Sequence, residues 1–507
     1  YDYDSLTLGE LDHALNQVYD QMTDRFEFIG FDACLMSTLE TANVLTPYAR
    51  YMYASQEMEP GSGWDYTSLL NNLAANPDQD GVQLGEKVCR EYYDHCADYG
   101  FGSQRSATFS IIDLSKIDDV LISMNEAFRV VYEQGDLGDV TRAVLEADSF
   151  GGNSVSEGYS NMLDLGNMLD QLSGYGQEVR DASQTLQSCV LYTMNGRLHK
   201  NASGLSVYYP VSIQGSEELK IFSQICPSNY YYALIDKIAY GAENGSAADY
   251  DNSTLLSDMA DINEWLGEES GFTGDVSTNA GEFADIEIGQ MGVSDIYFDE
   301  DGIYTVSFDN MDELAYACCS VGMDDDADGF FYLGTTEEVI YDIDRNCVTD
   351  NFDGLWPCIN DNLLALELVN TTDSCSIYTC NVLLNDEIET NLRIEYDWEY
   401  DEWSVIGIWD GIDEETGMAS REVYELQDGD VITPAYYWFS VDDDEDWYYG
   451  DDIVVDGDLE ITYEYLPEGV YYYCFELHDI YGNVYYTPFT LQYVDEDGEV
   501  WVDGEFY

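Results

Sequence analysis

The sequence predicts an α/β domain followed by all-β domains. Residues 1 to about 245 alternate helical and strand patterns, whereas residues from about 286 onward carry short runs rich in Tyr, Val, Ile, Phe and Trp. Asp-Gly or Asn-Asp turns separate these later runs. Strands that alternate with helices favour a parallel-type sheet covered on both faces, and closely spaced short strands favour β-sandwiches.

The chain length and a change in composition give the domain boundaries. The 507 residues suggest about three domains. We expect an α/β domain over residues 1–245, a linker over 246–285, a β-sandwich domain over 286–415 and an immunoglobulin-like β domain over 416–507. The linker is rich in Gly, Ser, Asn and Asp, with one short helix predicted at 257–266. The last domain is expected to close with a strand over 485–494.

The elements of the α/β domain follow from local patterns. Thr7 and Glu10 have the spacing of a capping box, which predicts the start of the first helix. The largely apolar run Phe26–Phe31 predicts a buried strand, and a short helix is expected over Ser37–Leu45, before Pro47. Further predicted elements are a strand at 107–114, a helix from there to about 133, and a strand at 205–209 that ends at Pro210.

Cys34 is the most informative residue of this domain. It follows the predicted strand at Phe26–Phe31, and a sharp turn to the next helix would expose its thiol at the carboxyl edge of the sheet. Asp32 places a carboxylate two residues earlier. The alternatives are a core cysteine, because unoxidised cysteines are often buried, and an aspartate that caps a local turn.

Several ordered motifs resemble those of the clostripain family of cysteine peptidases. The resemblance covers about the first 240 residues. The matching stretches are Leu6–Leu11, Phe28–Met36, Glu40–Ala42, Ser55–Tyr66, Asn161–Leu165 and Ala202–Pro210.

This resemblance implies a fold and a set of site residues. The expected fold is a caspase-like α/β/α sandwich, with Cys34 as the nucleophile and Asp32 as the carboxylate that selects Arg or Lys at the scissile position. Glu57, Ser62 and Trp64 lie in the loop that resembles the pocket wall of the family. Trp64 is expected either to stack on a bound guanidinium or to serve as a packing residue.

The histidines depart from the family pattern. In the family the catalytic His is followed by Gly and precedes the segment with which this sequence begins, whereas none of the four His here is followed by Gly. They are His13, His95, His199 and His478. Family members process themselves into a light chain with the His and a heavy chain with the Cys. We therefore expect a heavy chain, with the general acid on a separate light chain from the same precursor.

The charge balance excludes one class of partner. With 103 acidic against 16 basic residues, the formal net charge is -87. Nucleic acid is excluded because phosphate binding needs a basic surface. Such a field attracts cationic peptides, although solubility or adaptation to a salty or acidic habitat is the favoured cause of the charge. No apolar run has the ~18–20 residues of a membrane span. The resemblance to the clostripain family implies a bacterial protein that is secreted or held at the cell surface.

Metal-binding patterns are incomplete. Asp324, Asp326 and Asp328 precede Gly329 with the spacing of a calcium loop, but Thr335 stands where the EF-hand needs Glu. Clostripain is known as a calcium-dependent enzyme, so the resemblance makes bound calcium a hypothesis. No organic cofactor is expected, and no His/Cys cluster has zinc spacing. Among the 12 cysteines, Cys375 and Cys380 are spaced to close a hairpin.

Two functions from different classes follow. The first is a secreted cysteine endopeptidase that cleaves polypeptides after basic residues, Arg in preference to Lys. The second is an inactive surface, adhesin or assembly protein whose acidic β domains bind partners. The intact Asp32, Cys34 and Gly61-Ser62-Gly63-Trp64 favour the enzyme.

Overall fold

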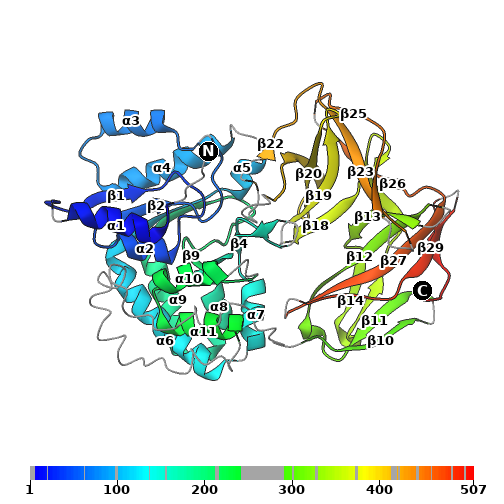
Figure 1. The fold of residues 1–507 in the computed structure, drawn as a ribbon, viewed down its shortest axis with the longest axis horizontal. Coiled ribbons are helices and arrows are strands. Elements are labelled where there is room, and N and C mark those ends of the chain that lie inside the picture. The colour runs from blue at the N-terminus through cyan, green and yellow to red at the C-terminus, as the bar shows by residue number, and fades with distance from the viewer. Residues whose placement is uncertain are drawn as a thin grey trace. The chain divides into compact units, whose positions relative to one another are not determined.

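A computed structural model describes residues 6–240 and 290–507, apart from residues 20, 62, 98–100, 136, 155–156, 212–215, 300–301, 326–328, 372–374, 413–419, 421–422, 441–444, 458, 481–482, 496–497 and 499. The predicted linker over 246–285, including its helix at 257–266, lies outside the described residues. The chain forms two compact units, Tyr1–Glu287 with Ile412–Arg421, and Ile288–Gly411 with Glu422–Tyr507. The described α-helices belong to the first unit, and the second is built from strands (Figure 1).

A mixed four-stranded sheet organises the first unit. Its order is β1-β2-β3-β8, with β1 (Phe26–Gly30) parallel to β2 (Ala49–Ala54). β3 (Thr108–Asp113) is antiparallel to both β2 and β8 (Val190–Asn195), so the expected parallel-type sheet is correct only for the first pair. Three helices lie between β2 and β3, and the chain enters β3 at the end where β2 finishes. Hydrophobic periodicity locates strands but does not give their direction.

Helices cover both faces of this sheet (Figure 1). Alternation along the strands sends Tyr53 and Ile111 to the face that packs on α4, whereas Met52 and Ile112 join the larger core with α2, α6, α8, α9 and α11. The helices are α1 (Leu8–Tyr19), α2 (Leu39–Leu45), α3 (Tyr66–Ala75), α4 (Gly81–Cys96), α5 (Phe101–Ser106), α6 (Ile117–Gln134), α7 (Leu137–Leu145), α8 (Leu165–Gln171), α9 (Gln177–Cys189), α10 (Ser216–Ile225) and α11 (Asn229–Tyr240).

Small antiparallel strands complete the first unit. β4 (Ser149–Phe150), β7 (Met162–Asp164) and β9 (Ser206–Tyr208) form a three-stranded sheet, and β5 (Asn153–Ser154) pairs with β6 (Gly158–Tyr159). The capping box is confirmed, because the Thr7 N–H donates to Glu10 Oε2 at 2.9 Å and the Glu10 N–H donates to Thr7 Oγ1 at 3.3 Å. No helix among the described residues combines the length and the apolarity that crossing a bilayer requires.

The second unit has two nested cores, so the predicted division at residues 415 and 416 is wrong. One core joins strands from both ends of the unit, through residues such as Tyr304, Trp356 and Tyr473. The other core lies between them in sequence, from Ile359 to Ile453. The strands of the expected immunoglobulin-like domain are divided between the two cores. Strand patterns do not reveal partners that are distant in sequence, and here such partners decide the domain.

One continuous sheet connects the two cores. Its path runs β22-β21-β20-β19-β18-β13-β12-β27-β29-β30, and β23 pairs with both β13 and β19. The strands of this unit are β10 (Val293–Phe298), β11 (Tyr304–Phe308), β12 (Leu314–Asp324), β13 (Gly329–Thr336), β14 (Val339–Asp342), β15 (Cys347–Asp350), β16 (Leu355–Ile359), β17 (Asn362–Leu363), β18 (Leu366–Thr371), β19 (Cys375–Leu384), β20 (Ile388–Asp397), β21 (Glu402–Trp409), β22 (Val423–Tyr424), β23 (Val431–Ser440), β24 (Glu445–Tyr449), β25 (Ile453–Val454), β26 (Ile461–Tyr465), β27 (Gly469–Asp479), β28 (Val484–Tyr486), β29 (Thr490–Val494) and β30 (Val500–Val502).

Two local predictions in this unit need correction. The closing strand expected over 485–494 is split into β28 and β29, with Pro488 between them, and proline cannot donate to a strand ladder. Cys375 and Cys380 lie on the single strand β19, and none of the twelve cysteines forms a disulfide.

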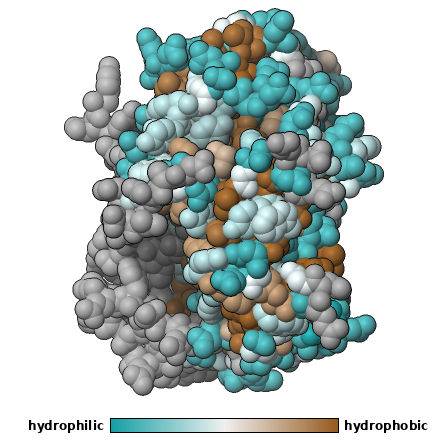
Figure 2. Space-filling model, turned by 90° about the vertical axis from the view of Figure 1, so that its right-hand side faces the viewer, coloured by the Kyte–Doolittle hydropathy of each residue, from teal (hydrophilic) through white to brown (hydrophobic). Residues whose placement is uncertain are grey.

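Hydrophobic side chains also reach the surface between hydrophilic ones, as Figure 2 shows.

Candidate active site

Cys34 lies in a tight turn between β1 and α2, as predicted. Leu35, the next residue, has a φ of 60°, in the left-handed region that branched residues rarely adopt. Two backbone hydrogen bonds hold this turn against the neighbouring loop. The Leu35 N–H donates to Glu57 O at 3.3 Å, and the Ser37 N–H donates to Ser55 O at 2.8 Å. The turn presents a half-buried thiol beyond the carboxyl end of β1.

The helix after this turn starts later than expected. α2 begins at Leu39 with Thr38 as its N-cap, not at Ser37. A parallel bridge from Thr38 to Ser206, and a hydrogen bond from the Ser37 hydroxyl to Gly204 O at 2.8 Å, keep these residues extended. Cys34 is therefore not at a helix N-terminus. Any stabilisation of its thiolate therefore has to come from a group other than the N-terminus of α2.

Glu59 supplies a donor to the thiol. Its backbone N–H donates to Cys34 Sγ at 3.2 Å, and its carbonyl oxygen lies 3.7 Å from the same sulfur. A backbone N–H aimed at sulfur favours the thiolate, which is the nucleophilic form of cysteine. Burial of the loop that contains Glu59 fixes this donor in place.

Asp32 is exposed beside the same loop. The Tyr66 hydroxyl donates to Asp32 Oδ2 at 2.8 Å. Gly63 has a φ of +65°, and a Cβ at this position would lie 2.6 Å from either carboxylate oxygen of Asp32. Only glycine therefore suits this position, because a side chain would meet both backbone strain and the carboxylate.

Glu59 forms a second carboxyl group next to Asp32, and sequence reasoning did not include it. The side chain is 4% exposed, and Trp64 Nε1 donates to Glu59 Oε2 at 3.2 Å. Burial, followed by the charge of Asp32 and a side-chain hydrogen bond with it, raises the pKa of Glu59 to about 9. The only sequence signal was the position of Glu59 in the Ser55–Tyr66 motif.

Trp64 serves as a packing residue, which was one of the two expectations for it. Its ring is buried, meets Phe109 edge-on at 5.2 Å and lies over Gly30. It contributes to the site through its hydrogen bond to Glu59.

The side chain of Glu57 has other partners than Asp32 and Glu59. Its buried carboxylate accepts from the Gly151 N–H at 3.1 Å and lies 3.2 Å from His199 Nε2. His199 Nδ1 lies 2.9 Å from Asp148 Oδ1. Burial opposes the charge of the imidazole, but the bonds to Asp148 and Glu57 outweigh it and raise the pKa of His199 to about 10. His199 is therefore a cation between two carboxylates.

Three of the four histidines have partners other than the thiol. His13 contacts Gln17 on α1, His199 is held as described, and His478 contacts Glu476 in the second unit. His95 belongs to the last turn of α4.

The remaining predicted site residues are only partly described. Ser62 lies outside the described residues, as do Asp326 and Asp328. Asp324 ends β12, and β13 begins at Gly329, so the acidic segment connects two strands of a hairpin. The adjacent Asp325 accepts from Trp438 Nε1 at 2.9 Å.

A half-buried thiol with a backbone donor, next to a pair of carboxyl groups, is the candidate nucleophile site of this unit. Residues 1–249 match the model of the clostripain family, and this part of the chain therefore belongs to that family as a cysteine peptidase domain. Among curated proteins, none matches the chain.

Solved structures with likeness to this chain include three bacterial proteases. A Bacteroides fragilis cysteine protease has 14% identity and a TM-score of 0.33, covering 45% of this chain and 93% of its own. A clostripain from Bacteroides thetaiotaomicron, in complex with a peptide inhibitor, has 16% identity and a TM-score of 0.31, covering 45% and 95%. An inactive zymogen C11 protease from Parabacteroides distasonis has 15% identity and a TM-score of 0.31, covering 43% and 61%.

Proposed function

We propose that this chain is the heavy chain of a caspase-like cysteine endopeptidase that cleaves polypeptides after Arg, and less well after Lys. One observation carries the proposal. The backbone of Glu59 contacts the thiol of Cys34, while its side chain forms a carboxyl pair with Asp32. A nucleophile and a binding site for a cation are thereby joined through one residue.

The chemistry assigned to Cys34 is acyl transfer. The thiolate attacks the scissile carbonyl carbon, the C–N bond breaks, and the amine leaves with a proton from an imidazolium. Water then hydrolyses the thioester. The N–H of Glu59 favours the thiolate before attack. By resemblance to the family, the oxyanion is held by the N–H of Cys34 and by the Gly that follows the catalytic His.

The carboxyl pair supports the preference for a basic side chain. Asp32 is exposed to an incoming substrate, and the buried carboxyl group of Glu59 lies beside it and interacts with it. A guanidinium presents several donors in a planar fork and satisfies two carboxyl groups at once. An ammonium group is a compact charge without that fork, so Arg is preferred over Lys.

Peptide substrates that differ only in the residue before the scissile bond test this function. We expect cleavage after Arg to exceed cleavage after Lys, and cleavage after Ala to be negligible. Asp32→Asn lowers kcat/KM for the Arg peptide by about 100-fold or more, because a charge-assisted pair is lost. Asp24→Asn, at an exposed ion pair with Arg50, is the matched control. Equal loss in both variants, or cleavage that is indifferent to Arg, contradicts the proposal.

We further propose that the catalytic His comes from a separate light chain. None of the four histidines is followed by Gly, and the contacts of His13, His199 and His478 are with residues other than Cys34. β1 is an edge strand of its sheet among the described residues, and Phe26 is 49% exposed. An edge strand offers unpaired backbone groups to a further strand. This finding also corrects the expected burial of Phe26–Phe31.

Mass analysis of native material tests this second chain. We expect a co-purifying polypeptide with a His-Gly pair, and modification of Cys34 by an Arg-directed acyloxymethylketone. Phe26→Asp should weaken the association, whereas a substitution at exposed Leu70 on α3 should not. A lone chain whose Cys34 reacts fully with the probe contradicts a separate light chain.

The alternative function is partner binding by the second unit without peptidase activity. A cavity of about 210 Å³ in this unit is lined by Trp447, Tyr449, Asn391 and Glu389 among others, a mixture of aromatic and polar groups. Failure of Cys34 to react with any peptidyl probe, even with a light chain present, would favour this alternative.

Calcium binding and export complete the proposal. The acidic segment Asp324, Asp326 and Asp328 is the proposed calcium site. A rise in melting temperature with added calcium, lost in Asp324→Asn, is the expected result. Secretion or display at the cell surface is tested by fractionating the native bacterial culture.

A further inference from the structure

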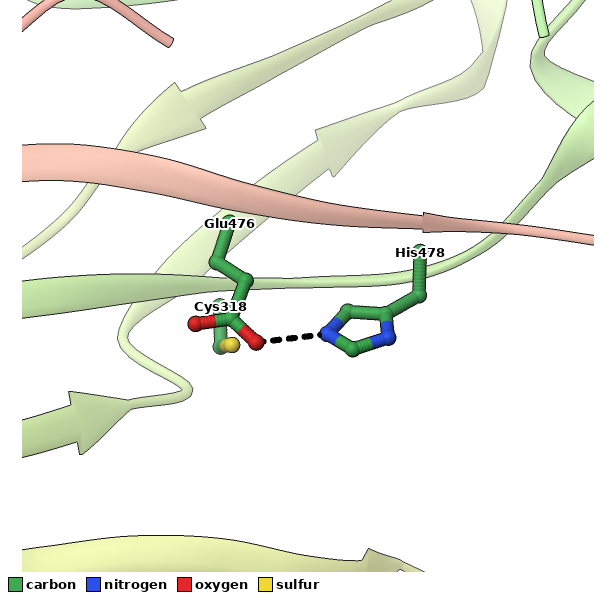
Figure 3. A group of neighbouring side chains, drawn as sticks. All are labelled: Cys318, Glu476 and His478. Carbon is green, nitrogen blue, oxygen red and sulfur yellow. Dashed lines mark hydrogen bonds and ion pairs between the residues drawn. The ribbon is translucent and has the colours of Figure 1, made fainter. Parts of the chain in front are cut away.

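Three side chains of metal-ligating types, a thiol, a carboxylate and an imidazole, lie close together on one side of two paired strands in the second unit (Figure 3). Cys318 lies on β12, and Glu476 and His478 lie on the neighbouring strand β27. The strands are antiparallel, with Cys318 opposite Glu476 and Tyr316 opposite His478. Alternate residues of a strand share a face, so Glu476 and His478 point to the same side. One donor atom from each of the three residues lies within 4.8 Å of the others.

Neighbouring groups hold these donors in place. His478 Nε2 lies 2.8 Å from Glu476 Oε1, and the Ser320 hydroxyl donates to Glu476 Oε2 at 3.1 Å. The ring of Tyr316 stacks on His478, with centroids 4.0 Å apart and planes 14° from parallel. The three donors therefore stand on two paired strands, with outer contacts that orient two of them.

The charge around the cluster is negative. The negative charge of Glu337 interacts electrostatically with Cys318. The negative charges of Glu367 and Glu476 repel each other. The one cation that acts on Glu367 is Arg393, whose guanidinium stacks on Trp409 at 3.8 Å. A bound cation would reduce the repulsion among these carboxylates.

We propose that Cys318, Glu476 and His478 bind a zinc ion. A thiolate, an imidazole and a carboxylate are the three ligand types that zinc takes in proteins. Calcium and magnesium prefer sets of oxygen ligands alone, so the thiol and imidazole exclude them. Cys318 is buried, whereas the side chains of Glu476 and His478 are 14% and 21% exposed, which leaves a side open for entry and for a fourth ligand. Binding displaces the thiol proton of Cys318 to solvent.

Sequence spacing did not reveal this site. The cysteine and the Glu-x-His pair belong to strands that are neighbours only in the folded unit. The site is independent of the peptidase function, since it uses none of the residues around Cys34.

Metal analysis of the full chain tests the proposal, in a Cys34→Ala background that removes the other accessible thiol. The protein is stripped with a chelator, loaded with zinc, desalted and analysed by mass spectrometry for bound metal. We expect one zinc per chain. Loading with cobalt instead should give the near-ultraviolet thiolate-to-cobalt charge-transfer band, which reports a sulfur ligand directly.

Variants assign the ligands. Cys318→Ser should abolish the cobalt band and reduce zinc at least tenfold, and His478→Gln should reduce zinc to a similar extent. Cys319→Ser is the matched control, because Cys319 is the next residue on β12 but faces the core on the other side. If Cys318→Ser fails to fold by circular dichroism, His478→Gln, at a partly exposed position, decides the result. Zinc that is absent in the parent, or unchanged in His478→Gln, overturns the proposal.

Discussion

Glu59 acts through two different parts of the same residue. Its backbone N–H contacts the sulfur of Cys34, and its carboxyl group faces Asp32. With the pKa of Glu59 raised to about 9, the pair carries one negative charge at neutral pH and two above that value. The charge that a basic substrate meets therefore depends on pH.

Ionisation of Glu59 should strengthen the binding of cations. Affinity for a reversible arginine-amide inhibitor is expected to rise between pH 7 and 9.5, by about tenfold if binding lowers the pKa by about one unit. Glu59→Gln should flatten this profile. Inhibition constants measured across this range check the prediction, with an uncharged inhibitor as control. Identical profiles in parent and variant would exclude Glu59 from the pocket.

His199 links stability to pH with a defined sign. Its folded pKa of about 10 exceeds its ordinary value near 6.5, so the folded state holds the proton that the unfolded state loses. The stabilisation is complete below about pH 6.5 and disappears as pH rises toward 10. His199→Gln should cost about 3–5 kcal/mol at pH 6, because the buried carboxylate of Glu57 and the partly buried one of Asp148 lose their cation.

Urea unfolding at pH 6 and 9.5 measures this effect. The difference in free energy of unfolding between parent and His199→Gln should shrink at the higher pH. His13→Gln, on the exposed face of α1, serves as control and should change little. A difference that stays constant with pH would mean that His199 is neutral in the folded protein.

Residue-level prediction succeeded where a residue and its neighbours in sequence are sufficient. The turn at Cys34 and the proximity of Asp32 followed from adjacent positions. Glu57 and Glu59 lie two residues apart in one loop, and the sequence offered no way to know which carboxyl group faces Asp32. Their roles depend on Gly151, His199 and Trp64, which approach only after folding.

At the scale of elements, the loop from Ser55 to Tyr66 places Glu59 and Gly63 next to Asp32, and Gly63 is a tightly restricted position in it. Gly63→Ala should distort the turn and press on Asp32, as its φ of +65° and the 2.6 Å approach require. We expect kcat/KM for Arg substrates to fall at least tenfold with a smaller change in melting temperature. Gly174→Ala, which meets no atom within 4 Å, is the control. Unchanged kinetics in Gly63→Ala would contradict this account of the pocket.

Element boundaries show what local patterns omit. The helix after Cys34 was expected to begin at Ser37, yet contacts with Ser206 and Gly204 delay it to Leu39. Strand β1 was expected to be buried, yet it lies at the edge of the described sheet. In the first case the deciding partners, Ser206 and Gly204, are remote in sequence from the helix that they delay.

At the scale of the whole molecule, the net charge of -87 predicts a kinetic effect. A strongly acidic protein accelerates encounters with cationic peptides at low salt, and screening removes this gain. kcat/KM for an Arg peptide extended with lysines should fall about tenfold or more between 10 mM and 500 mM salt. The same peptide extended with glutamates should show the opposite trend. If kcat/KM for both peptides depends on salt in the same way, the net charge does not accelerate substrate encounter, and solubility alone explains it.

The distribution of basic residues predicts resistance to self-cleavage. After Lys237 the sequence contains only Arg345, Arg393 and Arg421. Arg393 is buried, Arg421 lies outside the described residues, and Arg345 is exposed between β14 and β15. Prolonged incubation of active enzyme, followed by mass analysis, should show Arg345 cut before Arg393. Cleavage at all three sites at the rate of an unfolded substrate would contradict self-protection.

In the second unit, the β character could be predicted from the sequence, but the pairing of distant strands could not. Its β character was predicted from composition and turns, because both are local. The nested cores and the Cys318, Glu476 and His478 cluster depend on the pairing of β12 with β27, which no local pattern encodes.

That pairing affects how the chain folds during synthesis. The inner core, from Ile359 to Ile453, is complete before β27 leaves the ribosome, and it can form early. The outer core cannot form until β27 (Gly469–Asp479) has been synthesised and has paired with β12. Because many residues separate these two strands, their pairing closes a long loop and gives the outer core a high contact order. Until then β12 exposes a strand edge to other nascent chains. β27 and the strands after it complete the outer core, and a ribosome-stalled chain that ends before β27 should be protease-sensitive in β12 but protected in β19 and β20.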